Sequence, residues 1–227
     1  MKKSLVLLFV LAWTACLAAP PEGYFYTRAG STLHYLRHDP ETNSLSWTHD
    51  AMICGNKTLD DGSLEVDFRT TIISGKMKSP LKSSVTTNVT IRPDGTVELD
   101  VAHAAVVAAK QRFSAFNFTS SGGTSLLPST LKPGDKLDEI HAVVAWSGIK
   151  YTLDYTERQV LRRETVTVPA GTFDCIVVQE HKVEKAPLMK RDRITITWYA
   201  LGYGMVRHDT FFTNGDIETT EQLVSIN

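Results

Sequence analysis

Residues 193–199 read Arg-Ile-Thr-Ile-Thr-Trp-Tyr, and this stretch indicates the fold. Side chains along a β-strand point alternately to the two faces of a sheet. One face of this strand is therefore apolar and the other is polar: Ile194, Ile196 and Trp198 alternate with Thr195, Thr197 and Tyr199. The pattern favours an antiparallel sheet with one solvated face over a parallel sheet that is covered on both faces.

The same kind of segment recurs along the chain. Runs rich in Val, Ile, Thr and aromatic residues alternate with clusters of Gly, Pro, Asn and Asp, which is typical of an antiparallel β protein. Pro93-Asp94-Gly95 and Asn214-Gly215 predict tight turns between neighbouring strands. The predicted strands are residues 24–28, 32–38, 45–53, 64–74, 84–92, 96–101, 139–147, 150–155, 159–168, 173–183, 193–199, 203–212 and 217–225.

One segment breaks this rhythm. Residues 102–113 are rich in alanine and predict a helix, with Val101, Ala105 and Ala108 on one face. Residues 120–124 predict a loop. The expected fold is therefore mostly β, an antiparallel curved sheet or open half-barrel with one helix packed against it.

The N-terminus predicts export. Lys2 and Lys3 precede an apolar run over 5–13 and then small residues, which is typical of a secretory signal peptide. We expect a signal peptide over 1–18 and a single antiparallel β domain over 19–227. Thr14-Ala15-Cys16 also resembles the end of a bacterial lipobox, so lipidation of Cys16 is the alternative to its removal. Either route predicts an exported protein that is periplasmic or associated with the outer membrane.

Composition narrows the choice of partners. The 227 residues include 24 basic and 25 acidic side chains, with a formal net charge of -1. This balance gives no reason to expect nucleic acid, and membrane contact is expected only through a lipid anchor. Cys54 and Cys175 could form a disulfide in an oxidising compartment, or they could remain as two buried thiols. Neither CxxC nor a Cys/His zinc spacing occurs, so no metal or cofactor is predicted.

Two motifs in the second half resemble a known family. The run from Glu164 to Cys175, followed by that from Trp198 to Arg207, resembles exported bacterial proteins of the TapB family, which are mostly uncharacterised. The resemblance covers residues 126–226 and implies a secreted or envelope-associated antiparallel β fold. We assign four residues of these motifs to architecture. Pro169 and Gly171 suit a turn, and Gly202 and Gly204 suit a bulge or a tight passage beside a neighbouring backbone.

No motif for catalysis stands out. Gly-x-Ser-x-Gly, the phosphate-binding loop and the dinucleotide fingerprint are absent, so no catalytic residue is assigned. His34 and His38 fall in one predicted strand, roughly 13 Å apart, which is too far to share an ion. The basic stretch 182–193 is interpreted as an exposed hairpin connection that could contact an anionic envelope component.

These observations favour a non-catalytic protein of the cell envelope. We expect its curved sheet to cover an apolar cavity that binds a small apolar ligand or carries an envelope component, with Trp146, Tyr151 and Trp198 lining it. The alternative is a lipid-anchored interaction or scaffold protein that docks to another envelope protein. A third hypothesis is a hydrolase whose acid and base residues meet only in the folded chain.

Overall fold

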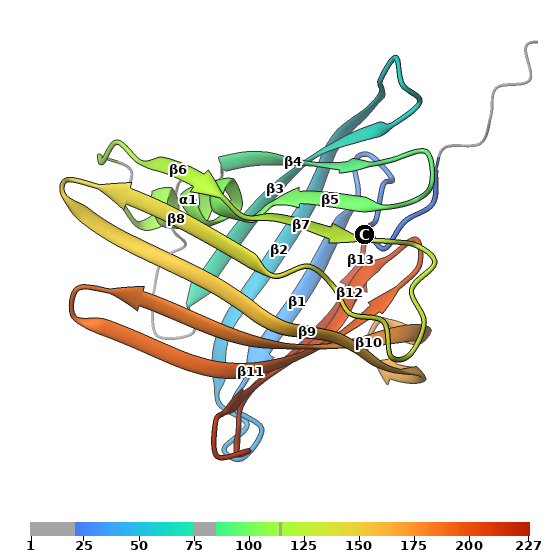
Figure 1. Ribbon diagram of the computed structural model, residues 1–227. Coiled ribbons are helices and arrows are strands. Elements are labelled where there is room, and N and C mark those ends of the chain that lie inside the picture. Colours follow the sequence, from blue (N-terminus) through green and yellow to red (C-terminus); the bar gives the residue numbers. More distant parts are fainter. Residues whose placement is uncertain (1–20, 75–84, 114) are drawn as a thin grey trace, which may run out of the picture.

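A computed structural model describes residues 21–74, 85–113 and 115–227, and the predicted signal peptide and Cys16 lie outside them. The described residues form one antiparallel sheet of 13 strands and one α-helix (Figure 1). The helix α1 is Val101–Arg112. The strands are β1 Thr32–His38, β2 Leu45–Thr58, β3 Leu64–Ser74, β4 Val85–Ile91, β5 Val97–Asp100, β6 Thr119–Gly122, β7 Thr124–Leu127, β8 Ile140–Trp146, β9 Ile149–Val168, β10 Gly171–Ala186, β11 Met189–Ala200, β12 Gly204–Phe212 and β13 Ile217–Ile226.

The sheet curls into a nearly closed barrel. Its strand order is β6-β8-β9-β10-β11-β12-β13-β1-β2-β3-β4-β5-β7. The two edge strands, β6 and β7, are separated along the chain by Gly123 alone. Gly122 and Gly123 both have positive φ, and an added Cβ at Gly123 would lie 2.6 Å from the Cβ of Ala142. Glycine is therefore needed where the chain passes from one edge of the sheet to the other.

This barrel confirms the predicted fold class, and three segments need correction. Residues 24–28 are not a strand, although they lie in the barrel. The predicted loop over 120–124 belongs to β6 and β7, because β8 and β5 supply the hydrogen-bonding partners that a local pattern cannot reveal. The predicted strands 150–155 and 159–168 are one strand, β9, which continues through Glu157 with its φ of 52°.

Helix α1 begins where β5 ends. Asp100 is its N-cap, and the Asp100 carboxylate accepts a hydrogen bond of 2.8 Å from the backbone N–H of His103. The helix packs against β4 on one side and against β6 and β8 on the other. It therefore covers the place where the two edges of the sheet approach one another.

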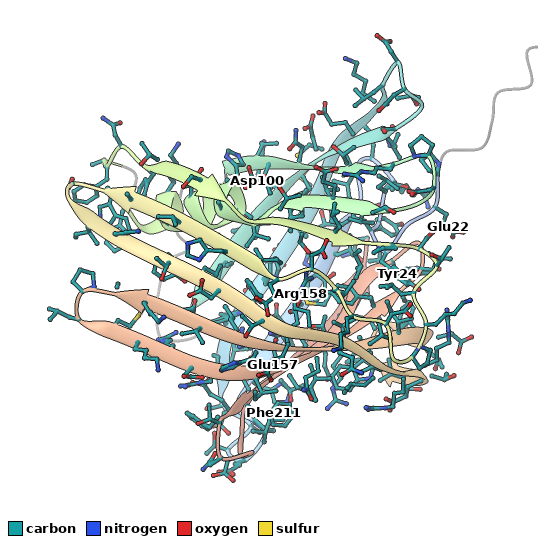
Figure 2. All side chains as sticks on the ribbon, viewed as in Figure 1. Glu22, Tyr24, Asp100, Glu157, Arg158 and Phe211 are labelled. Carbon is teal, nitrogen blue, oxygen red and sulfur yellow. The ribbon has the colours of Figure 1, made fainter. Side chains whose placement is uncertain are left out.

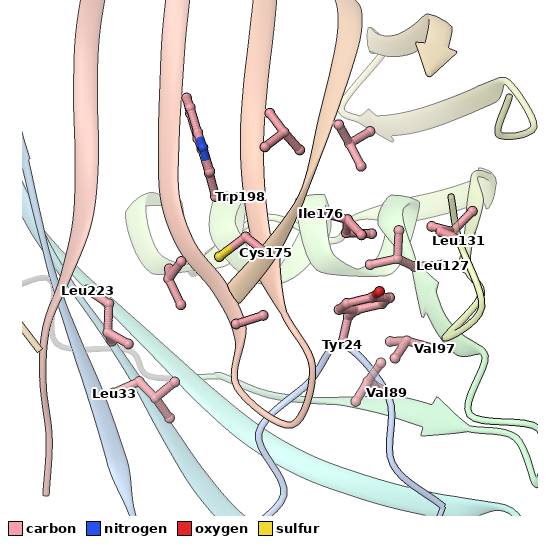
Figure 3. Packing of buried hydrophobic residues seen from close by; sticks show 14 of the residues in the cluster. Tyr24, Leu33, Val89, Val97, Leu127, Leu131, Cys175, Ile176, Trp198 and Leu223 are labelled. Atoms are coloured by element: carbon pink, nitrogen blue, oxygen red, sulfur yellow. The ribbon is translucent and has the colours of Figure 1, made fainter. Parts of the chain in front are cut away.

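The N-terminal segment closes one end of the barrel. The backbone N–H of Gly202 donates to the carbonyl of Gly23 over 2.8 Å. A Cβ at Gly204 would lie 3.4 Å from the Cα of Phe25, so the chain passes close to the turn between β11 and β12. Gly202 and Gly204 thus lie where the N-terminal segment passes close to this turn, and Pro169 lies in the turn between β9 and β10. Figure 3 shows the ring of Tyr24 among buried side chains of the core.

The prediction for residues 193–199, which lie in β11, needs one correction. Thr195 and Thr197 are only 1% and 2% exposed, and Tyr199 on the same face of β11 lines the barrel interior. The polar face of this strand therefore points inward. Alternation identified the strand, but it misassigned the solvated face, because part of the barrel interior is polar.

Candidate ligand-binding cavity

The barrel contains a partly open cavity of about 370 Å³, lined by the N-terminal segment and by helix α1. Its wall is mainly apolar and comes from both halves of the chain. A cavity of this size lies within the range of small-molecule sites. The lining residues are Tyr24, Phe25, Tyr26, Leu33, Tyr35, His49, Ala51, Ile53, Phe68, Thr70, Thr87, Val89, Val97, Leu99, Ala104, Val107, Ala108, Ser125, Leu127, Tyr199, Tyr203, Gly204 and Met205.

Helix α1 leaves this space open because two of the residues it turns to the cavity are alanines. Ala104, Val107 and Ala108 line the wall, at the spacing that places side chains on one helix face. The predicted face differs, since Val101 instead packs in a second, smaller cluster with Ala102, Ala142 and Leu153. The alanines that signal the helix in the sequence therefore also make room inside the barrel.

Polar groups border the cavity on one side. His49 lines it, and its Nδ1 lies 2.9 Å from a carboxylate oxygen of Glu221. The other Glu221 oxygen is 3.7 Å from the Arg37 guanidinium. Burial opposes ionisation of Glu221, but the hydrogen bond from His49 and the charges of His49 and Arg37 outweigh it and hold its pKa below the usual range.

Arg37 is held firmly in this border. Its guanidinium donates to the hydroxyls of Thr219 and Thr210 over 2.8 Å and 2.7 Å, and it lies 4.4 Å from the centre of the Trp47 ring. Burial lowers the pKa of Arg37, although neighbouring carboxylates such as Glu221 act in the opposite direction. The cation therefore stays in a fixed position beside the paired carboxylate.

A second buried ion pair reaches the cavity from β9 and β10. Arg158 Nε donates to Glu180 over 2.7 Å, and both side chains are less than a tenth exposed. Figure 2 labels Arg158 within the barrel. The same guanidinium donates to the carbonyl of Asp138 and to the hydroxyl of Ser125, which lines the cavity. The described residues contain no buried side-chain nitrogen or oxygen without a hydrogen-bond partner.

We call these five residues, Arg37, His49, Glu221, Arg158 and Glu180, the interior polar layer. His208 lies close to this layer, and its ring nitrogen is 2.8 Å from the hydroxyl of Thr197. Burial lowers the pKa of His208 to about 4, and the positive charge of Arg37 acts in the same direction. The interior thus joins a large apolar space to a set of fixed charges and hydrogen-bonding groups.

None of the three aromatic residues predicted to line the cavity is part of its wall. Trp146 packs on Phe118 at the start of the β8–β9 turn, with ring centres 5.4 Å apart. Tyr151 packs against the smaller cluster of Ala102, Ala142 and Leu153, and its hydroxyl donates to Glu184. Trp198 joins the main core on the other face of β11 from Thr197, and its Nε1 donates to Glu164.

Sequence reasoning missed the residues that do form the wall. Tyr24, Tyr26 and Tyr35 come from the N-terminal third, where no motif points to a site. No sequence motif includes His49 either. Its partner Glu221 is 172 residues away, so only the folded chain brings the two together.

The structure also places the two cysteines of the predicted disulfide. Cys54 is an exposed free thiol and Cys175 a buried one, so the structure contains no bridge between them. Burial raises the pKa of the Cys175 thiol to about 12. The described residues hold no group of three His, Cys, Asp or Glu side chains that could bind a metal ion. Within that part of the chain, no helix is both long and apolar enough to cross a membrane.

The fold and the cavity together define the class of protein: a nearly closed antiparallel β barrel with one short helix and an apolar interior cavity. The family model described as DUF3108-like matches residues 56–223, and the chain belongs to this family. No curated protein matches the chain.

Two solved structures share the fold. One is described as a "putative exported protein with YmcC-like fold" from Bacteroides fragilis, with a TM-score of 0.74 and 17% sequence identity. The other is described as a "putative lipoprotein" from Parabacteroides distasonis, with a TM-score of 0.74 and 16% identity. Each match covers 91% of this chain and 99% of the solved chain, so the likeness extends over nearly the whole fold.

Proposed function

We propose that this protein is an exported, non-catalytic protein of the cell envelope that binds an apolar or amphiphilic ligand inside its barrel. The observation that carries the proposal is the cavity of about 370 Å³ with its mainly apolar wall. The N-terminal sequence supports export, and the descriptions of the two similar structures agree with it. The narrower resemblance to the TapB family is part of the same proposal.

The cavity sets the size of the ligand. At about 30 Å³ for each small group, it holds about twelve groups of the size of a methylene or a water molecule. A single medium-length acyl chain would fit this volume. The interior polar layer borders the cavity at His49 and would receive a hydrogen-bonding head group of the ligand. The acyl chain of the ligand would then lie against Val107 and Leu127. The apolar wall would then contribute affinity, and the polar layer would orient the ligand.

The experiment is a binding assay with a defined probe. N-phenyl-1-naphthylamine becomes fluorescent in apolar surroundings, and dodecanoic acid or dodecanol should displace it from the purified mature protein. The variant Ala104→Trp places an indole at the cavity wall, at a half-buried position, and should weaken probe binding at least tenfold. The matched control is His103→Trp, which adds the same ring at an exposed position on the same helix.

Three outcomes would contradict the proposal in different ways. Equal binding by the two tryptophan variants would place the probe outside the cavity. A native mass spectrum of protein from an exporting host that shows no bound molecule, together with no probe binding, would favour the alternative of a docking protein. Hydrolysis of a p-nitrophenyl ester that is lost in His49→Gln would contradict the non-catalytic role, because His49 with Glu221 resembles a base held by a carboxylate.

A further inference from the structure

The β10–β11 hairpin ends in a fully exposed apolar tip. Leu188 has a relative exposure of 102%, and it follows Pro187 in the turn between Ala186 and Met189. Met189 is also exposed, at 36%. Leu188 therefore buries none of its apolar surface on folding, and it is available for contact outside the chain where further apolar side chains lie beside it.

A neighbouring turn adds to this tip. Lys185 on β10 pairs with Thr152 on β9, so the start of β9 lies next to the end of β10. Ile149, the first residue of β9, is 37% exposed, and the ring of Trp146 on the other side of that turn packs at a tilt against Phe118. Figure 1 shows both turns projecting at the same end of the barrel, opposite the end where the N-terminal segment lies.

Cations surround these apolar side chains. Lys150, Lys185, Lys190 and Arg191 are all exposed, and all lie within four residues of Leu188 or next to Ile149. Two of them have carboxylate neighbours, Lys185 with Asp154 at 3.9 Å and Lys190 with Asp192 at 3.1 Å. The tip as a whole therefore carries more positive than negative charge, although the whole chain has a formal charge of -1.

We propose that the paired tips of the β8–β9 and β10–β11 hairpins dock this protein on an anionic lipid surface. Leu188 would enter the acyl boundary, Met189 and Ile149 would follow it, and Trp146 would lie at head-group depth. The lysines and Arg191 would then contact lipid phosphates. A lipid surface fits better than a folded partner, because the apolar groups are single side chains on narrow turns, each beside a cation, rather than one flat patch.

This inference goes beyond the proposed function and uses different residues. Binding of the full mature chain should be measured by cosedimentation with vesicles of phosphatidylcholine alone and of phosphatidylcholine mixed with phosphatidylglycerol. We expect binding to the mixed vesicles that falls as salt rises. Leu188→Glu should reduce this binding about ten- to hundredfold, since a leucine no longer leaves water and a like charge approaches the surface.

The controls use the rest of the chain. Leu201→Glu changes an exposed leucine in the turn between β11 and β12, at 40% exposure, and should bind vesicles like the wild type. Replacing Lys185, Lys190 and Arg191 by Gln should weaken binding, whereas the same change at exposed Lys57, Lys132 and Lys136 should have a much smaller effect. Unchanged melting temperatures and unchanged binding of the naphthylamine probe would separate this surface from the cavity.

Two results would overturn the proposal. One is equal binding to neutral and anionic vesicles, or no binding to either. The other is an equal loss for Leu188→Glu and Leu201→Glu, which would mean that any added carboxylate has the same effect. Probe binding in the cavity could still persist in both cases, so failure here would leave the proposed function standing.

Discussion

Replacing Arg158 by methionine should destabilise the barrel by about 3–5 kcal/mol, the usual cost of leaving one member of a buried ion pair without its partner. The Arg158 and Glu180 side chains are 4% and 9% exposed, and the two charges meet at 2.7 Å. Arg158 also donates to the Asp138 carbonyl over 2.6 Å and to the Ser125 hydroxyl over 3.1 Å. The substitution removes all three bonds while Glu180 stays buried.

Urea unfolding at pH 7 would measure the change in the free energy of unfolding. In a thermal scan, the same loss corresponds to a fall of about 6–20 °C in Tm for a chain of this size. The matched control is Arg92→Met, because Arg92 and Glu98 also form a short ion pair, at 2.6 Å, but are 44% and 35% exposed. An exposed pair of this kind should contribute less than about 1 kcal/mol.

A double variant separates charge burial from packing. Replacing Arg158 and Glu180 together by methionine should recover much of the stability that Arg158→Met alone loses, because no buried charge is then left unpaired. If Arg158→Met costs no more than Arg92→Met, or if the double variant costs as much as Arg158→Met and Glu180→Met added together, the pair is not the buried contact described above.

Three further predictions concern other parts of the barrel. Burial and a neighbouring guanidinium hold the pKa of His208 at about 4, below the value of about 6.5 in an unfolded chain, so protons bind more readily to the unfolded state. Stability should therefore fall as the pH drops from about 6.5 towards 4, by up to about 1.4 kcal/mol per unit, and urea unfolding of His208→Gln at pH 7 and pH 5 should show a smaller fall than in the wild type. Gly123→Ala should cost clearly more than Gly148→Ala in the same assay, because both glycines have φ near 80° but only at Gly123 would a Cβ meet another side chain, at 2.6 Å; equal costs would contradict the described closure of the barrel. Of Cys54 and Cys175, only Cys54 should react with a thiol reagent in the native protein, and fast labelling of the buried Cys175, whose pKa burial raises to about 12, would contradict its position in the core.

Local pattern revealed most of the strands and the single helix, because each signal lies within a few residues. The turn at Asn214-Gly215 and the alanine-rich segment are of this kind. The closure of the barrel has no such local signal, because it depends on the pairing of β6 and β7 with strands that are distant in the sequence. Alternation alone would place the polar Thr195 and Thr197 in solvent for the same reason: it gives two faces, but only the closed sheet decides which of them is inside.

The cavity was predictable as a class of site but not in its residues. Aromatic side chains from the second half looked suitable for its wall, yet Trp198 is part of the core and Trp146 lies at a hairpin tip. The wall instead uses tyrosines near the N-terminus and small residues of α1 such as Ala108. The small side chain of an alanine produces no motif in the sequence. The space that it leaves is therefore recognised only when the neighbouring residues of the fold are known.

The interior polar layer bears on ligand binding as well as on stability. A barrel that needed only stability could fill the space around His49 and Arg37 with apolar side chains, since buried ion pairs seldom contribute more than well-packed hydrophobic groups. Here the charges are paired and fixed by hydrogen bonds to Thr210 and Thr219, while the adjoining space is left unfilled beside Ala108. The cavity therefore has a fixed polar group at one side and an apolar wall elsewhere. This arrangement suits an amphiphilic molecule, which has one polar and one apolar end. Binding of dodecanol and of dodecane should therefore be compared in the wild type and in His49→Gln. The wild type should bind dodecanol more tightly than dodecane, and this difference should shrink in His49→Gln. Equal affinities of the wild type for the two ligands would mean that the polar layer contributes to the stability of the barrel alone.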